Sequence, residues 1–238
     1  KSLPKTVCEK LDNGRLNDAK TILEFCNNNG ITVVNYHNRN YPAMLREIDN
    51  PPVVLYVKGN LPDFNSLPSI CVVGPRSVSE FGKKSAYSLG YRLAKAGFIV
   101  VSGGAVGSDT YAHLGALKAE GITVLIMACG FSVSYLEENR ALREHIAKSG
   151  CLISEYPPDV PVNRGTFQVR NRLMSGLSLG TVLVEAAKRS GALITANHAL
   201  EQGRDVFVIP GMPNMKQYSG SNMLLRDGAK PLLDTSDI

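Results

Sequence analysis

Three arginines lie within nine residues of the segment NRGTFQVRNRLMSGLS (163–178), and they carry the strongest chemical signal in the chain. Arg164, Arg170 and Arg172 surround Phe167, with no acidic residue between them. Basic side chains interleaved with an exposed aromatic suit single-stranded nucleic acid, because the cations follow phosphates while the ring stacks on a base. The same spacing also fits a helix start in which Phe167 enters the core and the arginines are solvated. Spacing alone leaves both interpretations open.

A glycine-rich loop, GGAVGSD (103–109), precedes an expected helix. Glycines allow backbone amides to approach a phosphate closely, and the helix N-terminus adds a favourable partial charge. The loop matches neither GxGxxG nor the Walker pattern GxxxxGK[ST]. It therefore predicts either a phosphate cradle or a tight turn that needs positive φ angles. The candidate ligands are Gly103, Gly104 and Gly107.

Two further loops contain residues suited to anions. In GPRS (74–77), Arg76 could hold a phosphate with two hydrogen bonds, or could pair with Glu80. In KRSG (188–191), two positive charges precede a Ser-Gly helix start, which is a second possible phosphate cradle. The candidates from these loops are Gly74, Arg76, Ser77, Ser190 and Gly191.

Glu185 is the only carboxylate close to these loops in the sequence. It could be catalytic, but we favour a salt bridge that orients Arg170 or Arg172. Segment 163–189 holds five basic residues against Glu185 alone, a net charge of +4. The four histidines form no recognisable Ser-His-Asp constellation, so we assign no catalytic residue.

Composition narrows the class of protein. The chain has 238 residues, with 26 basic and 21 acidic side chains and a net charge of +5. No apolar run approaches the roughly 20 residues needed to span a bilayer. The five cysteines show no metal-ligand spacing, and several flank apolar runs, so we expect reduced thiols, a cytoplasmic protein and no metal or cofactor.

Short apolar runs alternate with helical patterns from residue 69 onward. Such runs, rich in Val, Ile and Leu, are typical of strands buried on both faces of a parallel sheet. Strands are expected at 69–74, 98–104, 122–130, 151–156, 180–186 and 205–211. Helices are expected at 79–96, 109–119, 138–148, 171–177 and 191–202. This alternation predicts a doubly wound α/β fold, whose ligands bind beyond the carboxyl ends of the strands.

The N-terminal quarter differs in character. A helix is expected at 17–28 and an extra strand at 51–60. We interpret residues 1–37 as the remnant of an N-terminal helical module, and residues 38–238 as an extended Rossmann-like domain whose first part, 38–69, packs on the sheet.

Several motifs occur together in an order that resembles the DNA processing protein A family (DprA, also called Smf). They include YPAMLREIDNPPVVLYVKGN (41–60), VVGPRS (72–77), VSGGAVGSDTYAH (101–113), SEYPP (154–158), FQVRNRLMSGLS (167–178), the long run 182–211 and GSNMLLRDGA (220–229). The resemblance covers residues 38–238. It implies an extended Rossmann-like protein without enzymatic activity, which binds and protects single-stranded DNA, forms a homodimer and loads the RecA recombinase during natural transformation.

The resemblance also implies a DNA pocket. Carried over to this sequence, it falls on Arg76, the 103–107 loop, Arg164, Phe167, and the pair Arg170 and Asn171. The chain departs from the family pattern in two places. Pro75 stands where members often have Ser or Thr, and an acidic pair, Glu137 and Glu138, lies near the expected pocket rim. The dimer surface would include the stretch Met223–Leu225.

Two alternatives remain at the level of sequence. In a nucleotide phosphoribohydrolase of the same superfamily, Glu185 would activate water and the 103–107 loop would hold a 5′-phosphate. The diagnostic PGGxGTxxE motif is absent, since 178–186 retains only part of it. The chain could also be a scaffold that binds a protein partner through a helix face without touching DNA.

Overall fold

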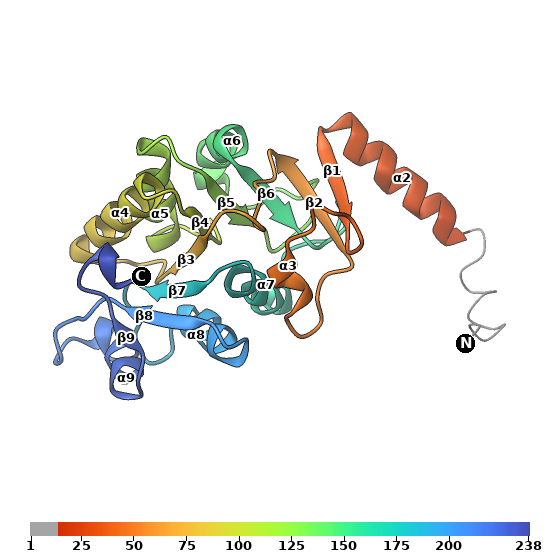
Figure 1. The fold of residues 1–238 in the computed structure, drawn as a ribbon. Helices are drawn as coiled ribbons and strands as arrows, with labels where there is room; N and C mark the ends of the chain where they lie inside the picture. The colour runs from red at the N-terminus through yellow and green to blue at the C-terminus, as the bar shows by residue number, and fades with distance from the viewer. Residues whose placement is uncertain (1–13) are drawn as a thin grey trace.

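A single mixed sheet of nine strands organises the protein in the computed structural model, which describes residues 14–238 (Figure 1). Its centre consists of the six expected parallel strands, and each observed bound lies within four residues of the predicted one. They are β3 (Ser69–Val73), β4 (Ile99–Ser102), β5 (Thr123–Ile126), β6 (Cys151–Ser154), β7 (Gly180–Leu183) and β8 (Asp205–Val208). The predicted α/β, extended Rossmann-like, mostly parallel architecture is confirmed.

The spatial order of the strands is β1-β2-β6-β5-β4-β3-β7-β8-β9. The extra strand expected at 51–60 is β2 (Val54–Gly59), which pairs antiparallel with β6, while β9 (Lys230–Pro231) extends the other edge in parallel. The sequence missed β1 (Ile31–Asn35), which pairs antiparallel with β2. Strand order reverses at β3, because the chain builds outward to β6 on one side and then returns to β7 on the other.

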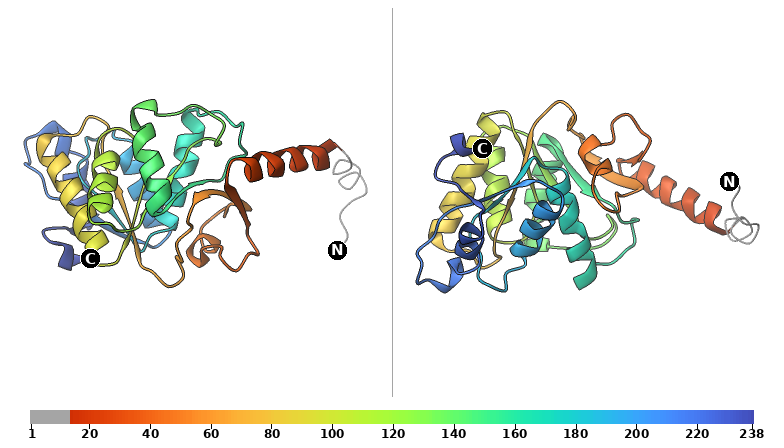
Figure 2. Two further views of the ribbon diagram at one scale, coloured as in Figure 1. Left: turned by 90° about the horizontal axis from the view of Figure 1, so that it is seen from above. Right: turned by 60° about the horizontal axis from the view of Figure 1, so that its bottom comes forward.

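Helices cover both faces of the sheet (Figure 2). One face carries α4 (Glu80–Lys95), α5 (Ser108–Lys118) and α6 (Arg140–Ser149), and the other carries α7 (Arg164–Gly176) and α8 (Ala192–Glu201). Strand β3 shows why both faces are apolar. Ile70 and Val72 join the core under α4, whereas Cys71 and Val73 join the core under α7. Alternate side chains therefore fill two separate cores.

The helix boundaries follow from local capping. The hydroxyl of Ser79 accepts the Gly82 amide at 3.0 Å and begins α4. Asn163 and Thr166 form a reciprocal capping box that begins α7. This helix begins seven residues before the start at 171 that the sequence pattern predicts. Without a hydrophobic stripe in 164–170, the capping pair was the available signal.

Smaller elements complete the fold. Helix α2 (Gly14–Asn28) projects from the edge of the sheet (Figure 1), α3 (Ala43–Arg46) lies in the lead-in, and α9 (Ser221–Arg226) follows β8. Strand β1 lies within the segment 1–37, and the division of the chain into two modules stays a prediction. In residues 14–238, no helix combines the length and apolar character needed to cross a membrane. Four cysteines, at 26, 71, 129 and 151, are buried free thiols, and Cys8 lies outside the described residues.

Candidate nucleic-acid interface

A cavity of about 780 Å³ opens at the carboxyl end of β3, where the strand order reverses. Its walls come from the turn after β3, the first turns of α7 and α8, and one side of α9. This is the position at which open α/β sheets bind ligands. Eight of the predicted site residues line the cavity: Gly74, Arg76, Arg164, Phe167, Arg170, Asn171, Ser190 and Gly191.

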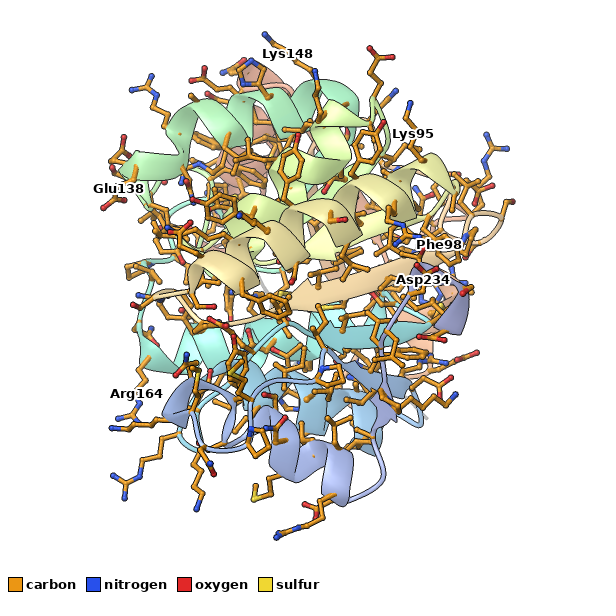
Figure 3. The ribbon with its side chains drawn as sticks, turned by 90° about the vertical axis from the view of Figure 1, so that its left-hand side faces the viewer. Lys95, Phe98, Glu138, Lys148, Arg164 and Asp234 are labelled. Atoms are coloured by element: carbon orange, nitrogen blue, oxygen red, sulfur yellow. The ribbon has the colours of Figure 1, made fainter. Side chains whose placement is uncertain are left out.

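Four basic residues surround the mouth of this cavity, and we call them the basic rim: Arg76, Arg164, Lys188 and Arg189. All four are exposed, and Arg164 points outward at the cavity edge of the molecule (Figure 3). None takes part in an ion pair within residues 14–238. The alternative pairing of Arg76 with Glu80 is absent there, because Glu80 pairs with Lys83. Among the residues that the structure describes, the buried Asp109 is the only carboxylate that lines the cavity.

Phe167 forms part of the cavity wall with one side packed against the protein. Its ring lies 5.7 Å from the ring of Tyr135, centroid to centroid, at an angle of 59°. The guanidinium carbon of Arg76 lies 5.3 Å from the centroid of the same ring. Phe167 is thus half-buried, so both sequence interpretations hold in part. The ring is fixed by Tyr135 and still contributes to the cavity.

Arg170 lies beneath the cavity and is 4% exposed. Its guanidinium donates to the carbonyl oxygens of Gly103, at 3.0 Å, and of Ile126, while its Nε donates to the side chain of Asn171 at 3.2 Å. These carbonyls lie just beyond β4 and at the end of β5. Arg170 therefore ties the carboxyl ends of two strands together and places a positive charge below the cavity floor.

Asp109 is the acidic counterpart of Arg170 at this depth. Burial raises the pKa of the Asp109 carboxyl, and the positive charge of Arg170 together with the Ala105 amide opposes that rise. Because the cavity lies in a region with Arg170 and four rim cations against this one buried acid, its potential is positive. Such a site attracts anionic ligands.

Other groups of the same chain pack against the glycine-rich loop, so it has no space for a phosphate. Gly103, Gly104 and Gly107 are all buried and do not line the cavity. A Cβ at Gly103 would lie 2.6 Å from the Arg170 guanidinium, and Gly107 combines a φ of +102° with a 2.4 Å approach to the carbonyl of Arg76. The loop therefore fits the tight-turn interpretation and positions Arg170 and Arg76. Ser77 is exposed but also lies outside the cavity.

Arg172 and Glu185 have partners that the sequence did not indicate. Arg172 forms an ion pair with Glu155, in which both side chains are mostly buried, and it does not line the cavity. Glu185 pairs with neither arginine, contrary to expectation. Its carboxylate accepts both the backbone amide and the hydroxyl of Ser79, each at 2.7 Å. Glu185 is fully buried and supports the start of α4.

The acidic pair after β5 lies close to this region without entering it. Glu137 and Glu138 are exposed in a short 3₁₀ helix (Glu137–Asn139), and neither lines the cavity. Asn139, which follows them, is buried and donates to the Gly104 carbonyl at 2.9 Å. Figure 3 shows Glu138 on the same edge of the molecule as Arg164. This acidic pair would therefore affect binding only through charge at a distance.

Sequence reasoning missed several residues of the cavity wall. Gln168, Asn197 and Met223 line it, as do Lys188 and Arg189, which the sequence indicated only as charges beside the possible phosphate cradle at 190–191. On α7, the helical spacing of 164, 168 and 171 puts these residues on one face, a signal that was lost because the predicted helix began at 171. Within residues 14–238, no cluster of three potential metal ligands occurs.

The extended Rossmann-like sheet and the basic cavity at its switch point define a class of α/β proteins that bind anionic ligands. Residues 32–238 match the model of one family, DNA recombination-mediator protein A. Because the match spans most of the chain, the protein belongs to this DprA/Smf family.

Relatives support this assignment. The chain is 38% identical to the DNA processing protein DprA of Bacillus subtilis, over 88% of this chain and 70% of the relative. It is 38% identical to protein Smf of Synechocystis, over 83% of this chain but only 50% of the relative. Because this chain spans only part of such longer relatives, their activities are only proposed for it.

Solved structures agree with the fold. DprA from Streptococcus pneumoniae superimposes with a TM-score of 0.82 at 37% identity, covering 87% of this chain and 72% of that one. DprA from Helicobacter pylori, studied for its single-stranded DNA binding mode, gives 0.78 at 28% identity, covering 87% and 93%. A molybdenum cofactor binding protein from Rippkaea orientalis, at 21% identity and 0.52, shares the fold alone.

Proposed function

We propose that this protein binds single-stranded DNA through the cavity and its basic rim, and that it does so without catalysing a reaction. The observation that carries the proposal is the basic rim itself: four exposed cations, none of which forms an ion pair within residues 14–238, surround a cavity with an aromatic ring in its wall. Cations contact phosphates irrespective of sequence, and the ring of Phe167 offers a stacking surface for a base. The DNA-binding relative from Helicobacter pylori supports the same assignment.

The rim makes a quantitative prediction. For single strands, the logarithm of affinity falls with the logarithm of salt concentration by about 0.7 for each phosphate contacted. Four contacts predict a slope near −3, and removal of two cations should reduce it to about −1.5. Affinity should depend little on base sequence, because the charges do not read base edges.

The test is fluorescence anisotropy with labelled oligo-dT over a salt series. The double variant Lys188→Ala/Arg189→Ala should bind more weakly and show the shallower slope. The control Arg140→Ala/Lys148→Ala removes the same charge from α6, outside the cavity, and should behave as the unaltered protein does. Equal affinity and slope in the two variants would overturn the proposal.

The alternative hydrolase lacks a suitable base in this arrangement. Both carboxylate oxygens of Glu185 accept hydrogen bonds from Ser79, and the residue does not line the cavity. In the 103–107 loop, which would hold the 5′-phosphate, Gly103 packs against Arg170, Gly104 against Leu125 and Gly107 against the carbonyls of Pro75 and Arg76. These contacts favour binding without hydrolysis.

The remaining parts of the proposal come from family membership. We include protection of incoming DNA, loading of RecA during natural transformation, a homodimer and a cytoplasmic location, the last consistent with four buried reduced thiols. For the dimer surface, Met223 on α9 is exposed whereas Leu224 is buried in the core. Sedimentation velocity of a Met223→Glu variant tests this: a dimer in the unaltered protein and a monomer in the variant would support it, and an unchanged mass would contradict it.

A further inference from the structure

The outer surface of α4 and α5 carries a row of aromatic and basic side chains that the cavity does not use. We call it the α4–α5 strip, and it consists of Lys83, Lys84, Tyr87, Tyr91, Lys95 and Tyr111. Tyr87 and Tyr91 are 37% and 36% exposed. A shallow depression of about 350 Å³ lies at the start of the strip, lined by Glu80, Lys83, Lys84, Tyr87 and Tyr111.

Close packing of the two helices makes this surface continuous. A Cβ at Gly90 would lie 2.1 Å from the Ala112 carbonyl, and a Cβ at Gly115 would lie 2.1 Å from the Tyr87 carbonyl. Two glycines thus allow the helix backbones to touch, and side chains on the outer faces of both helices share one surface. Leu114, 40% exposed on α5, extends the apolar part of this surface.

The charges on the strip are positive and associated with its rings. Lys83 Nζ lies 6.0 Å from the centroid of Tyr111, and Lys95 Nζ lies 5.8 Å from the centroid of Tyr91. Lys84 and Lys95 take part in no ion pair within the described residues. Glu80 is the one carboxylate in the depression, and Lys83 neutralises it at 2.5 Å.

The strip begins at the edge of the molecule where the cavity opens. Helix α4 starts four residues after the rim residue Arg76, and in Figure 3 it crosses the face from the side of Arg164 and Glu138 toward Lys95. With a rise of 1.5 Å per residue, α4 extends about 22 Å from Glu80 to Lys95. A strand that leaves the cavity past Arg76 therefore meets a surface long enough for several more nucleotides.

We propose that the α4–α5 strip is a second binding surface for single-stranded nucleic acid, which holds the strand after it leaves the cavity. The proposal rests on the proposed function. Lysines at both ends of α4 flank two tyrosines, so that phosphate contacts and stacking surfaces lie along one line, as single-strand binding requires. An apolar protein partner would not need the lysines, and a membrane-binding helix would present a larger apolar face.

The experiment compares a thymidine pentanucleotide with oligo-dT of about 25 nucleotides, by anisotropy at low salt. In the variant Lys84→Glu/Lys95→Glu, affinity for the long oligonucleotide should fall about tenfold while affinity for the short one is unchanged. The control Lys20→Glu/Lys148→Glu places the same charges on exposed positions of α2 and α6, and Figure 3 shows Lys148 apart from Lys95. Equal losses with this control would overturn the proposal.

A second measurement uses the unaltered protein, so it does not depend on whether the introduced glutamates disturb folding. Photocrosslinking of the unaltered protein with oligo-dT that contains 4-thiothymidine should label the peptide with Tyr87 and Tyr91 only when the long oligonucleotide is used. Absence of that crosslink would overturn the proposal that the α4–α5 strip binds the strand. The pentanucleotide could fail to bind the unaltered protein while the long strand still crosslinks to α4. That result would contradict DNA binding in the cavity and would support DNA binding on the α4–α5 strip.

One competing occupant is an anionic membrane surface. Vesicles of phosphatidylcholine and phosphatidylserine provide that comparison in a flotation assay. Binding to vesicles that is lost in Lys84→Glu/Lys95→Glu, without any change in binding of the long oligonucleotide, would assign the strip to lipid and overturn the proposal.

Discussion

The guanidinium of Arg76 lies over the ring of Phe167, 5.3 Å from its centroid, although 91 residues separate the two in the sequence. Arg76 comes from the turn after β3 and Phe167 from the first turns of α7. The contact places the Arg76 guanidinium, which would bind a phosphate, next to the Phe167 ring, on which a base would stack. It therefore brings together the two interactions that single-strand binding needs.

Replacing Phe167 by Leu tests the stacking role. Leucine retains part of the packing against Tyr135 but offers no aromatic face. Base stacking contributes roughly 1–3 kcal/mol for each base, so affinity for oligo-dT should fall at least about fivefold, as measured by anisotropy. The salt slope should stay the same, because no charge changes. The control Phe81→Leu alters an exposed aromatic outside the cavity, and a comparable loss there would contradict the assignment.

Arg172 should matter for stability rather than for DNA binding. In Arg172→Met, Glu155 is left without its partner in a mostly buried position, and breaking such a pair costs about 3–5 kcal/mol. Urea denaturation should show this loss, and the added change Glu155→Gln should recover part of it. Anisotropy on the folded variant should give an unaltered affinity for oligo-dT. A loss of affinity without a loss of stability would place Arg172 in the interface.

Glu185 should likewise act on folding. In Glu185→Gln, one of the two hydrogen bonds from Ser79 loses its acceptor, so the start of α4 is weakened by about 1–2 kcal/mol. The free energy of unfolding measures this effect. Neither the unaltered protein nor the variant should release a free base from nucleoside monophosphates, followed by chromatography. Base release that disappears in the variant would establish the hydrolase alternative.

His113 should make the protein sensitive to acid. It is fully buried, its Nδ1 lies 2.7 Å from the Thr123 hydroxyl, and burial together with the charge of Arg170 lowers its pKa from 6.5 to about 3. The neutral form is thus favoured in the folded state. The unfolded state binds one more proton between pH 6.5 and 3, so stability present above pH 6.5 is lost as the pH falls, by up to about 1.4 kcal/mol per pH unit.

The measurement is the free energy of unfolding in urea at pH 7.5, 6.0 and 5.0. His113→Asn keeps a donor for Thr123 but does not titrate, so its stability should decline less steeply over this range. An equal slope in both proteins would show that other groups dominate. His145, exposed on α6, serves as the matched control: His145→Asn should retain the original slope.

The order of strands and helices could be predicted from the sequence because it depends on local patterns. Continuous runs such as 69–73 and 180–183 indicate strands buried on both faces, and glycines mark the turns between them. Strand β1 was missed because it is short, only Ile31 and Val34 of its five residues are buried, and its partner β2 lies about 20 residues further along the chain. The start of α7 was missed for a similar reason, because its capping pair is polar and its apolar residues come later.

The sequence by itself determined the class of fold, the family and the presence of a cluster of positive charge. Only the tertiary structure decided which of those charges are free. Of the cations between 163 and 189, Arg170 is buried against strand-end carbonyls and Arg172 is paired with Glu155, which leaves Arg164, Lys188 and Arg189 beside Arg76. The reason is physical: periodicity and charge are properties of neighbours in the chain, whereas burial and ion pairing depend on segments that meet only after folding.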